Sequence, residues 1–169
     1  SDAAQIRPGI VYASLSAYSE TGPWGGRRGF DSLVQTATGI GHAGAVACGM
    51  NQPATRPLPA QALDHGSGWI LAAGVMEALR RRALEGGSWH VRTSLISVRN
   101  FLVSLGTVDG LDFHDPSQAE IADLLTSTSG RSSTIGHVAV PGSLSVSPPG
   151  WSEAGRPLGG DRPKWWAAD

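Results

Sequence analysis

The sequence has little cysteine and no excess of charge of either sign. Its 169 residues contain one cysteine, Cys48, which excludes an internal disulfide framework and favours a reducing, cytoplasmic compartment. Lysine and arginine number 13 against 14 aspartate and glutamate residues, which leaves a net charge of −1. We therefore expect no electrostatic surface for nucleic acid or membrane lipid. No run reaches the roughly 18 apolar residues of a membrane span, and we expect no signal peptide.

Glycine and proline, in contrast, are frequent. There are 23 glycines and 11 prolines, which predicts many turns but stays below the level typical of disorder. Six tryptophans are many for this length, and most of them stand in Gly/Pro-rich context. His42 has no second candidate ligand at metal spacing, so no metal site is expected.

The most informative stretch runs from Leu58 to Arg82. Trp69 to Met76 is apolar on every side, which predicts a buried helix, and Asp64 stands just before a Gly-Ser-Gly turn that would precede this helix. Backbone N–H groups and the helix dipole favour a negative charge at such a position. Asp64 is therefore either a helix cap, a task that Ser67 could share, or a carboxylate nucleophile between glycines that allow a substrate to approach.

Three blocks of sequence favour the nucleophile. The first block consists of Ala62 to Gly68 and Ala73 to Arg80. The second consists of Arg7 to Tyr18, the Gly22-Pro23 and Arg28 to Asp31 motifs, and the Gln35-x-x-x-Gly39 pattern. The third block is Gly87 to Leu95. In order and spacing they resemble family III CoA-transferases, the formyl-CoA transferase, carnitine CoA-transferase and alpha-methylacyl-CoA racemase family. The resemblance covers roughly residues 6 to 105.

The resemblance implies an α/β fold: part of a Rossmann-like parallel sheet with packed helices, followed by an irregular Pro/Gly/Trp-rich tail. It implies that Asp64 attacks an acyl-CoA thioester, carries CoA as an aspartyl thioester and passes it to a carboxylic acid. CoA thioesters would be substrates, with no other cofactor bound. The residues expected to contact substrate or CoA are Tyr18, Gln35, His65, Gly66 and Gly68. Gly66 and Gly68 could offer backbone N–H groups to an oxyanion, and His65 is a donor or a plain loop residue. Tyr18 could equally be an aromatic cap over the sheet edge.

The racemase branch of the family is disfavoured. It needs a histidine in a Gly-His-Asp motif as an acid–base partner of the nucleophile-position aspartate. Here the corresponding stretch is Gly29-Phe30-Asp31, and phenylalanine cannot carry a proton.

The remaining pattern predicts the framework. Residues 10–16 and 89–95 are expected as strands, 30–39 as a helix with Phe30, Leu33, Val34 and Ala37 on its inner face, and the residues after 95 as a helix to about 105. Residues 39–49, nearly all small, predict close backbone packing or a mobile loop. Residues 118–125 are expected as one short helix with Leu124 and Leu125 inward, and 127–134 as a polar loop. This organisation divides the chain into a CoA-transferase-like part, 1–108, and a shortened linker, short strands and tail, 109–169, packing back on it.

Relatives are longer than this chain, so we expect the isolated chain to be incomplete. The resemblance implies a homodimer, or a partner chain that supplies an N-terminal part. The alternative is a non-catalytic fragment or assembly subunit of the same family. Half of a doubly wound sheet would expose an unpaired edge and an apolar face.

Overall fold

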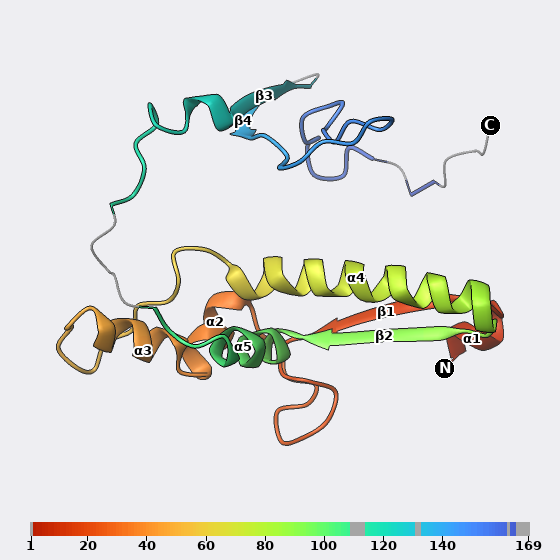
Figure 1. Ribbon diagram of the computed structural model, residues 1–169, viewed down its shortest axis with the longest axis horizontal. Helices are drawn as coiled ribbons and strands as arrows, with labels where there is room; N and C mark the ends of the chain where they lie inside the picture. Colours follow the sequence, from red (N-terminus) through yellow and green to blue (C-terminus); the bar gives the residue numbers. More distant parts are fainter. Residues whose placement is uncertain (1, 109–113, 131–132, 162, 165–169) are drawn as a thin grey trace. The chain divides into compact units, whose positions relative to one another are not determined.

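The computed structural model describes residues 2–108, 114–130, 133–161 and 163–164. The chain divides into two compact units, Ser1–Leu111 and Asp112–Asp169 (Figure 1). The first residues of the expected linker, 109–113, and the tryptophans at 165 and 166 fall outside the described residues. In the part that is described, no helix is long and apolar enough to cross a membrane.

A parallel pair of strands forms the centre of the first unit. After a short helix α1 (Asp2–Ile6), strand β1 (Val11–Ser16) pairs with β2 (Trp89–Ser94), so that Val11 lies opposite Trp89 and Ser16 opposite Ser94. Parallel strands need a long crossover, and here it contains helix α4 (Ala62–Glu85), which runs along the pair (Figure 1). The strands and the mixed α/β class confirm the prediction.

The two faces of this strand pair differ in chemistry. On one face, Val91 meets α4 so closely that a Cβ at Gly74 would stand 2.7 Å from its Cγ1 atom. Because side chains alternate along a strand, the opposite face carries the register pairs Tyr12 with His90 and Ser14 with Arg92. The face away from α4 is therefore polar and is not the expected apolar face; on the side of α4, Leu15 is 49% exposed.

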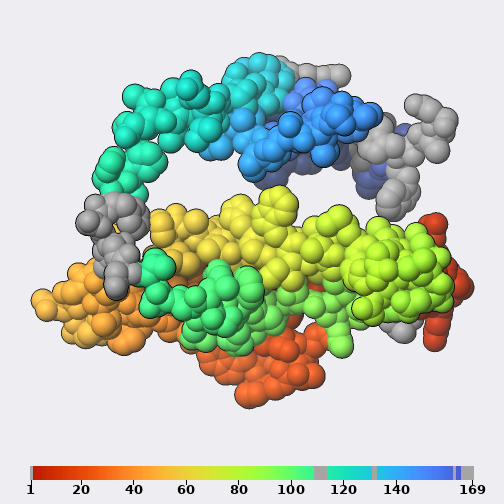
Figure 2. Space-filling model, in the orientation of Figure 1, coloured from red at the N-terminus to blue at the C-terminus, as the bar shows by residue number. Residues whose placement is uncertain are grey.

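Helix α4 begins earlier than expected. The Asp-His-Gly-Ser-Gly stretch was expected as a turn before the helix, but it forms the first turns of α4, whose N-cap is Gln61. The expected burial on all sides was also wrong. The buried residues Leu63, Ser67 and Ala78 lie on one side, whereas Trp69 is 74% exposed and Met76 is 65% exposed. In the described chain α4 has neighbours along one side, and its other side chains form part of the surface in Figure 2.

Two short helices precede α4. Helix α2 (Asp31–Ala37) confirms the helix expected over 30–39, and Val34 is fully buried, but Phe30 and Leu33 are 77% and 56% exposed and do not line its inner face. Helix α3 (Ile40–Ala47) forms most of the stretch 39–49, so of the two alternatives close backbone packing is confirmed and the mobile loop is wrong. Its glycines still allow close packing, since a Cβ at Gly44 would stand 2.2 Å from the carbonyl oxygen of Arg56.

The core of the first unit lies where the helices begin. Its buried cluster is formed by Val34, Leu63, Leu95 and Val98, with Ala17, Tyr18, Ile40 and Leu102 packed against it. The four buried residues come from α2, the start of α4 and helix α5 (Leu95–Ser104), which confirms the helix expected after residue 95. Burying such side chains contributes roughly 1.5–3 kcal/mol each. The core therefore fixes the beginnings of α2, α4 and α5 relative to the carboxyl ends of the strands.

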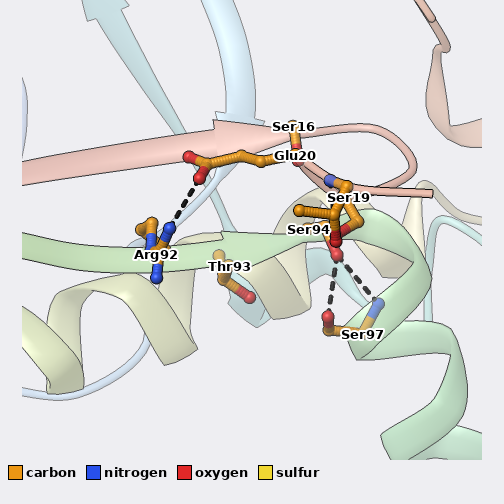
Figure 3. A pocket seen from close by; sticks show the side chains of 8 residues that line it. Ser16, Ser19, Glu20, Arg92, Thr93, Ser94 and Ser97 are labelled. Carbon is orange, nitrogen blue, oxygen red and sulfur yellow. Dashed lines mark hydrogen bonds and ion pairs between the residues drawn. The ribbon is translucent and has the colours of Figure 1, made fainter. Parts of the chain in front are cut away.

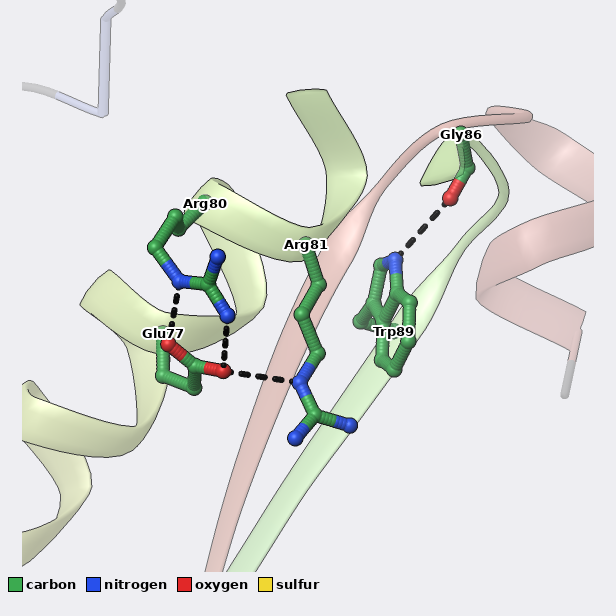
Figure 4. A network of polar contacts seen from close by, with 5 residues as sticks. All are labelled: Glu77, Arg80, Arg81, Gly86 and Trp89. Atoms are coloured by element: carbon green, nitrogen blue, oxygen red, sulfur yellow. Dashed lines mark hydrogen bonds and ion pairs between the residues drawn. The ribbon is translucent and has the colours of Figure 1, made fainter. Parts of the chain in front are cut away.

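The other end of α4 is held by polar contacts (Figure 4). Glu77 accepts hydrogen bonds from Arg80 and Arg81, and the guanidinium of Arg81 lies 5.6 Å from the centre of the Trp89 ring. The Trp89 indole N–H donates to the carbonyl of Gly86 at 3.0 Å. These contacts connect the last turns of α4 to the beginning of β2.

The second unit contains a short hairpin. A 3-10 turn, η1 (Ala122–Leu124), leads into β3 (Leu125–Ser129), which pairs antiparallel with β4 (Thr134–Val138). The helix expected over 118–125 is therefore wrong, and so is the inward position of Leu124 and Leu125, which are 57% and 42% exposed. Of the residues 127–134, expected as a polar loop, 127–129 and 134 belong to the hairpin strands, and Ser129 lies opposite Thr134.

Candidate active site

A buried carboxylate caps the helix that carries Asp64. Asp31, the first residue of α2, is 0% exposed, and its Oδ2 atom accepts the backbone N–H of Leu63 at 2.7 Å and that of Asp64 at 2.9 Å. The first N–H groups of a helix have no partner within the helix, and a carboxylate satisfies them with charge-assisted bonds. Asp31 therefore performs the capping that the sequence assigned to Asp64 or Ser67.

Asp64 itself is exposed, in the first turn of α4. Among the described residues its carboxylate makes no hydrogen bond or ion pair, whereas its backbone is held through Asp31. Ser67 lies inside the helix, fully buried, and its hydroxyl has no partner in the described part of the chain. The cap interpretation of Asp64 is thus wrong. A carboxylate on a fixed backbone, open to solvent, has the geometry that a nucleophile needs.

Gln35 secures the chain segment that leads into α4. It is 1% exposed; its amide nitrogen donates to Asp31 Oδ1 and to the carbonyl of Ala60 at 3.1 Å, and its amide oxygen accepts the N–H of Leu58 at 2.8 Å. All of these partners lie in α2 or in the approach to α4. Gln35 was expected to contact CoA. In the structure it bonds to Asp31, which in turn bonds to the backbone of Asp64, so it orients Asp31.

Gly66 and Gly68 lie within the helix rather than in a turn. Backbone N–H groups in a helix interior bond to the carbonyl four residues earlier, so these two are not free to hold an oxyanion. Gly66 has a packing role instead: a Cβ there would stand 2.8 Å from Val98 Cγ1. At Gly68 a Cβ would meet nothing within 4 Å. His65, expected in a loop, is also helical and is exposed beside Asp64.

Tyr18 is half-buried and packs against the core cluster. Its ring meets Trp24 edge to face, with centroids 5.0 Å apart. Within this first unit the tyrosine therefore supports the loop that follows β1, and the arginine of that loop, Arg27, places its guanidinium 4.9 Å from the Trp24 ring centre.

A cavity of about 400 Å³ opens at the carboxyl end of β1. Its lining residues are Ser16, Ala17, Gly26, Arg27, Arg28, Gly29 and Phe30. Its lining is mainly apolar, with Arg27 and Arg28 as its cationic residues, and among the described residues neither arginine forms a salt bridge. Ligands of open α/β sheets bind beyond the carboxyl ends of the strands, which is where this cavity lies. Its last wall residue, Phe30, directly precedes Asp31, which holds the backbone of Asp64.

Sequence reasoning missed Asp31 and the two arginines as functional candidates. Asp31 was read only as part of the Gly-Phe-Asp motif, and nothing in its spacing of 33 residues from Asp64 indicates a shared hydrogen bond. Arg27 and Arg28 could have been noted as adjacent cations in a Gly-rich loop, a usual setting for binding anions. In the described ranges no group of three His, Cys, Asp or Glu residues could hold a metal ion.

Comparison with known proteins places the chain among CoA-transferases. A probable fatty acyl-CoA transferase, Rv3272, of Mycobacterium tuberculosis is 33% identical over 99 residues, which are 57% of this chain and 24% of that protein. The acetyl-coenzyme A transferase nodX of Hypoxylon pulicicidum is 33% identical over 102 residues, 60% of this chain and 17% of that protein. The crystal structure of Rv3272 matches 56% of this chain and 26% of its own, with a TM-score of 0.47 at 33% identity.

This chain spans about a quarter or less of the length of the curated relatives it matches. The sequence profile described as "CoA-transferase family III" matches residues 1–116, which is well over half of the chain and includes Asp31, Asp64 and the cavity at the end of β1. The resemblance inferred from the three sequence blocks is confirmed by this match. The chain belongs to CoA-transferase family III.

Proposed function

We propose that this chain carries the nucleophile of a CoA-transferase, and that Asp64 is this nucleophile. The reaction moves CoA from an acyl-CoA thioester to a carboxylic acid. The observation that carries the proposal is the pairing of an exposed Asp64 carboxylate with a backbone fixed through the buried Asp31. A nucleophile held in this way needs little reorganisation before it attacks.

The steps balance as two exchanges at one carboxylate. An Asp64 oxygen attacks the thioester carbonyl, the C–S bond breaks, and CoA thiolate leaves a mixed anhydride between the acyl group and Asp64. The thiolate then attacks the Asp64 carbonyl, which releases the first carboxylic acid and forms an aspartyl-CoA thioester. The acceptor carboxylate attacks this thioester, and the released thiolate attacks the acceptor's carbonyl in the new anhydride. Asp64 returns to its starting state, and one difficult transfer is divided into easier ones.

We place the anionic part of CoA at the cavity beyond β1. CoA carries a 3′-phosphate and a diphosphate, and guanidinium groups bind phosphate oxygens with strong, charge-assisted hydrogen bonds. Arg27 and Arg28 supply such groups in a cavity whose wall continues into Asp31. Phe30, which stands where a racemase needs histidine, supplies an exposed apolar ring and no proton.

Trapping with hydroxylamine tests the proposal. The chain is incubated with acetyl-CoA or succinyl-CoA and hydroxylamine, and its intact mass and peptides are measured. Hydroxylamine converts an activated aspartyl group to a hydroxamate, so we expect a single modification at Asp64 that requires the acyl-CoA. Asp64→Asn should abolish it, because the amide cannot attack. Asp123→Ala, an exposed aspartate of the second unit, should leave it unchanged.

Absence of modification at Asp64 with every thioester would contradict a working nucleophile in this chain. The non-catalytic assembly subunit would then become the better account. Modification that persists in Asp64→Asn would assign the nucleophile to another residue.

A further inference from the structure

A second cavity, of about 240 Å³, lies at the ends of the two parallel strands (Figure 3). It is lined by Ser16, Ser19, Glu20, Thr21, Arg92, Thr93, Ser94 and Ser97. Apart from one Arg–Glu pair, every lining side chain carries a hydroxyl group. Pockets for drug-sized ligands usually measure about 300–1,000 Å³, so this one has room for a small polar molecule. Ser16 also lines the cavity that contains Arg27 and Arg28 beyond β1, so the two cavities are adjacent.

Hydrogen bonds at this cavity connect the loop that follows β1 to both strands. Glu20 Oε2 accepts a hydrogen bond from Arg92 Nη1 at 2.7 Å, and its Oε1 accepts one from the Ser14 hydroxyl at 3.3 Å. The loop reaches this position through Ser19, whose φ of 100° is unfavourable for a residue with a Cβ. Such conformations persist where the surrounding contacts impose them.

The lining has more hydrogen-bond donors to offer than acceptors. Both Glu20 oxygens are engaged, and the hydrogen bond from Arg92 keeps the pKa of Glu20 below its ordinary value, so this carboxylate stays charged at neutral pH. A guanidinium has five N–H donors, and among the described residues Arg92 uses one nitrogen, Nη1. The remaining donors of Arg92 and the surrounding hydroxyls match the two oxygens of a carboxylate.

Charge selects between a carboxylate and a phosphate. The Glu20 carboxylate already offsets the charge of Arg92, so the cavity is close to neutral. A site without net positive charge does not compensate the cost of removing an anion from water, and this cost grows with the square of the ligand's charge, so a dianion is disfavoured more than a monoanion. The balance therefore favours a monocarboxylate.

We propose that the cavity between Ser19–Thr21 and Arg92–Ser97 is a binding site for a small monocarboxylic acid. Resting on the proposed function, this acid is the acceptor, since the cavity adjoins the one assigned to CoA. Its carboxylate is held by the free edge of the Arg92 guanidinium, and the serine and threonine hydroxyls hold its oxygens. The negative charge of Glu20 disfavours ligands that carry more than one negative charge.

Acetate, inorganic phosphate and methyl acetate are the probes, titrated into the isotope-labelled chain at pH 8 without CoA. Binding is followed by the backbone amide chemical shifts of residues 19–21 and 93–97. We expect saturable shifts with acetate and none with neutral methyl acetate or with phosphate, which is mainly a dianion at this pH. Because CoA is absent, acetate binding is measured separately from any transfer chemistry.

Four variants at three exposed side chains sharpen the test. Arg92→Gln should weaken acetate binding by about tenfold or more, as expected for a lost charge-assisted bond, and Arg92→Lys should fall between it and the unmodified chain. Glu20→Gln should strengthen acetate binding severalfold and should admit phosphate. Arg80→Gln, an equal change of charge on α4, should have no effect.

The response to Glu20→Gln separates ligand binding from a structural role. If Glu20 serves only to hold the loop, its replacement would lower acetate binding or leave it unchanged, which overturns the proposal. Equal binding of phosphate and acetate to the unmodified chain, or no saturation with acetate, would also overturn it. Hydroxamate formation at Asp64 with failed acetate binding would refute this site alone, whereas acetate binding without hydroxamate formation would refute the proposed function.

Discussion

The side chain of Asp31 accepts the backbone N–H of Asp64 at 2.9 Å, across 33 residues of sequence. This bond joins the first turn of α2 to the first turn of α4. The buried carboxylate of Asp31 thereby caps the helix that carries the exposed carboxylate of Asp64. The two aspartates therefore have complementary roles, one structural and one, as we propose, chemical.

Removal of the capping carboxylate should destabilise the chain. Asp31→Ala leaves the N–H groups of Leu63 and Asp64 and the amide of Gln35 without this partner, and an unsatisfied buried group costs about 1–3 kcal/mol. We expect the free energy of unfolding in urea to fall by about 2–3 kcal/mol. Asp31→Asn, which retains one acceptor, should lose about half as much. Equal stability of Asp31→Ala and the unmodified chain would refute the capping role.

The two glycines beside Asp64 should respond oppositely to alanine. At Gly66 a Cβ would stand 2.8 Å from Val98, and overpacking of this kind costs about 1–3 kcal/mol. At Gly68 a Cβ meets nothing within 4 Å, and alanine in a helix interior is favoured over glycine by about 1 kcal/mol. Thermal unfolding should therefore show a lower Tm for Gly66→Ala and a higher one for Gly68→Ala. The double variant Gly66→Ala/Val98→Ala should show favourable coupling, and simple additivity would contradict the predicted contact.

Ser19→Gly should stabilise the chain. The φ of 100° at Ser19 is costly for serine and is accessible to glycine, and the hydroxyl gives up one long bond, 3.5 Å, from the N–H of Thr21. We expect a gain of up to about 1 kcal/mol in urea unfolding, offset in part by the greater freedom of glycine in the unfolded chain. Ser32→Gly, in the first turn of α2, is the matched control and should destabilise. A loss of stability in Ser19→Gly would show that serine is not strained there.

Acid should selectively remove the contribution of Glu77. Its hydrogen bonds from Arg80 and then Arg81 lower the pKa from the ordinary value of 4.5 to about 2. A lowered folded-state pKa means that the contribution is complete above about pH 4.5 and is lost as the pH falls toward 2. The Tm difference between the unmodified chain and Glu77→Gln should therefore be constant above pH 5 and close between pH 4.5 and 2.

Salt provides the control for the ion pairs of Glu77, because Glu77, Arg80 and Arg81 are all exposed. The Tm difference should shrink at high ionic strength, where exposed charges are screened. A Tm difference for Glu77→Gln that persists unchanged to pH 2 would disprove the ionic origin.

Arg28 should contribute to the affinity for CoA through phosphate. Arg28→Gln is expected to weaken CoA binding, measured by calorimetry, by about tenfold, as for the loss of one charge-assisted contact. If the contact is to the 3′-phosphate, dephospho-CoA should bind the unmodified chain and Arg28→Gln equally; if it is to the diphosphate, both ligands should weaken alike. Arg80→Gln is the charge-matched control. No change with either ligand would remove Arg28 from the proposed site.

Local sequence determined much of the framework. The β-branched and aliphatic runs at 10–16 and 89–95 form strands because side chains of this kind suit a half-buried pleated surface, and the helix after residue 95 begins at its serine cap, where Ser94 accepts the N–H of Ser97. The three sequence blocks were sufficient to identify the family, because the order and spacing of short motifs can be read directly from the sequence.

Tertiary structure decided what those motifs do. The local pattern at Asp64 also fits a cap of its own helix, and only the approach of α2 places Asp31 where it takes that task. The run from Trp69 to Met76 predicted burial on all sides, but burial depends on neighbours, and α4 has them along one side. Gly66 and Gly68 look alike in sequence, yet Val98 packs against the first and nothing meets the second. Contacts between residues far apart in the chain follow from packing, which local pattern does not encode.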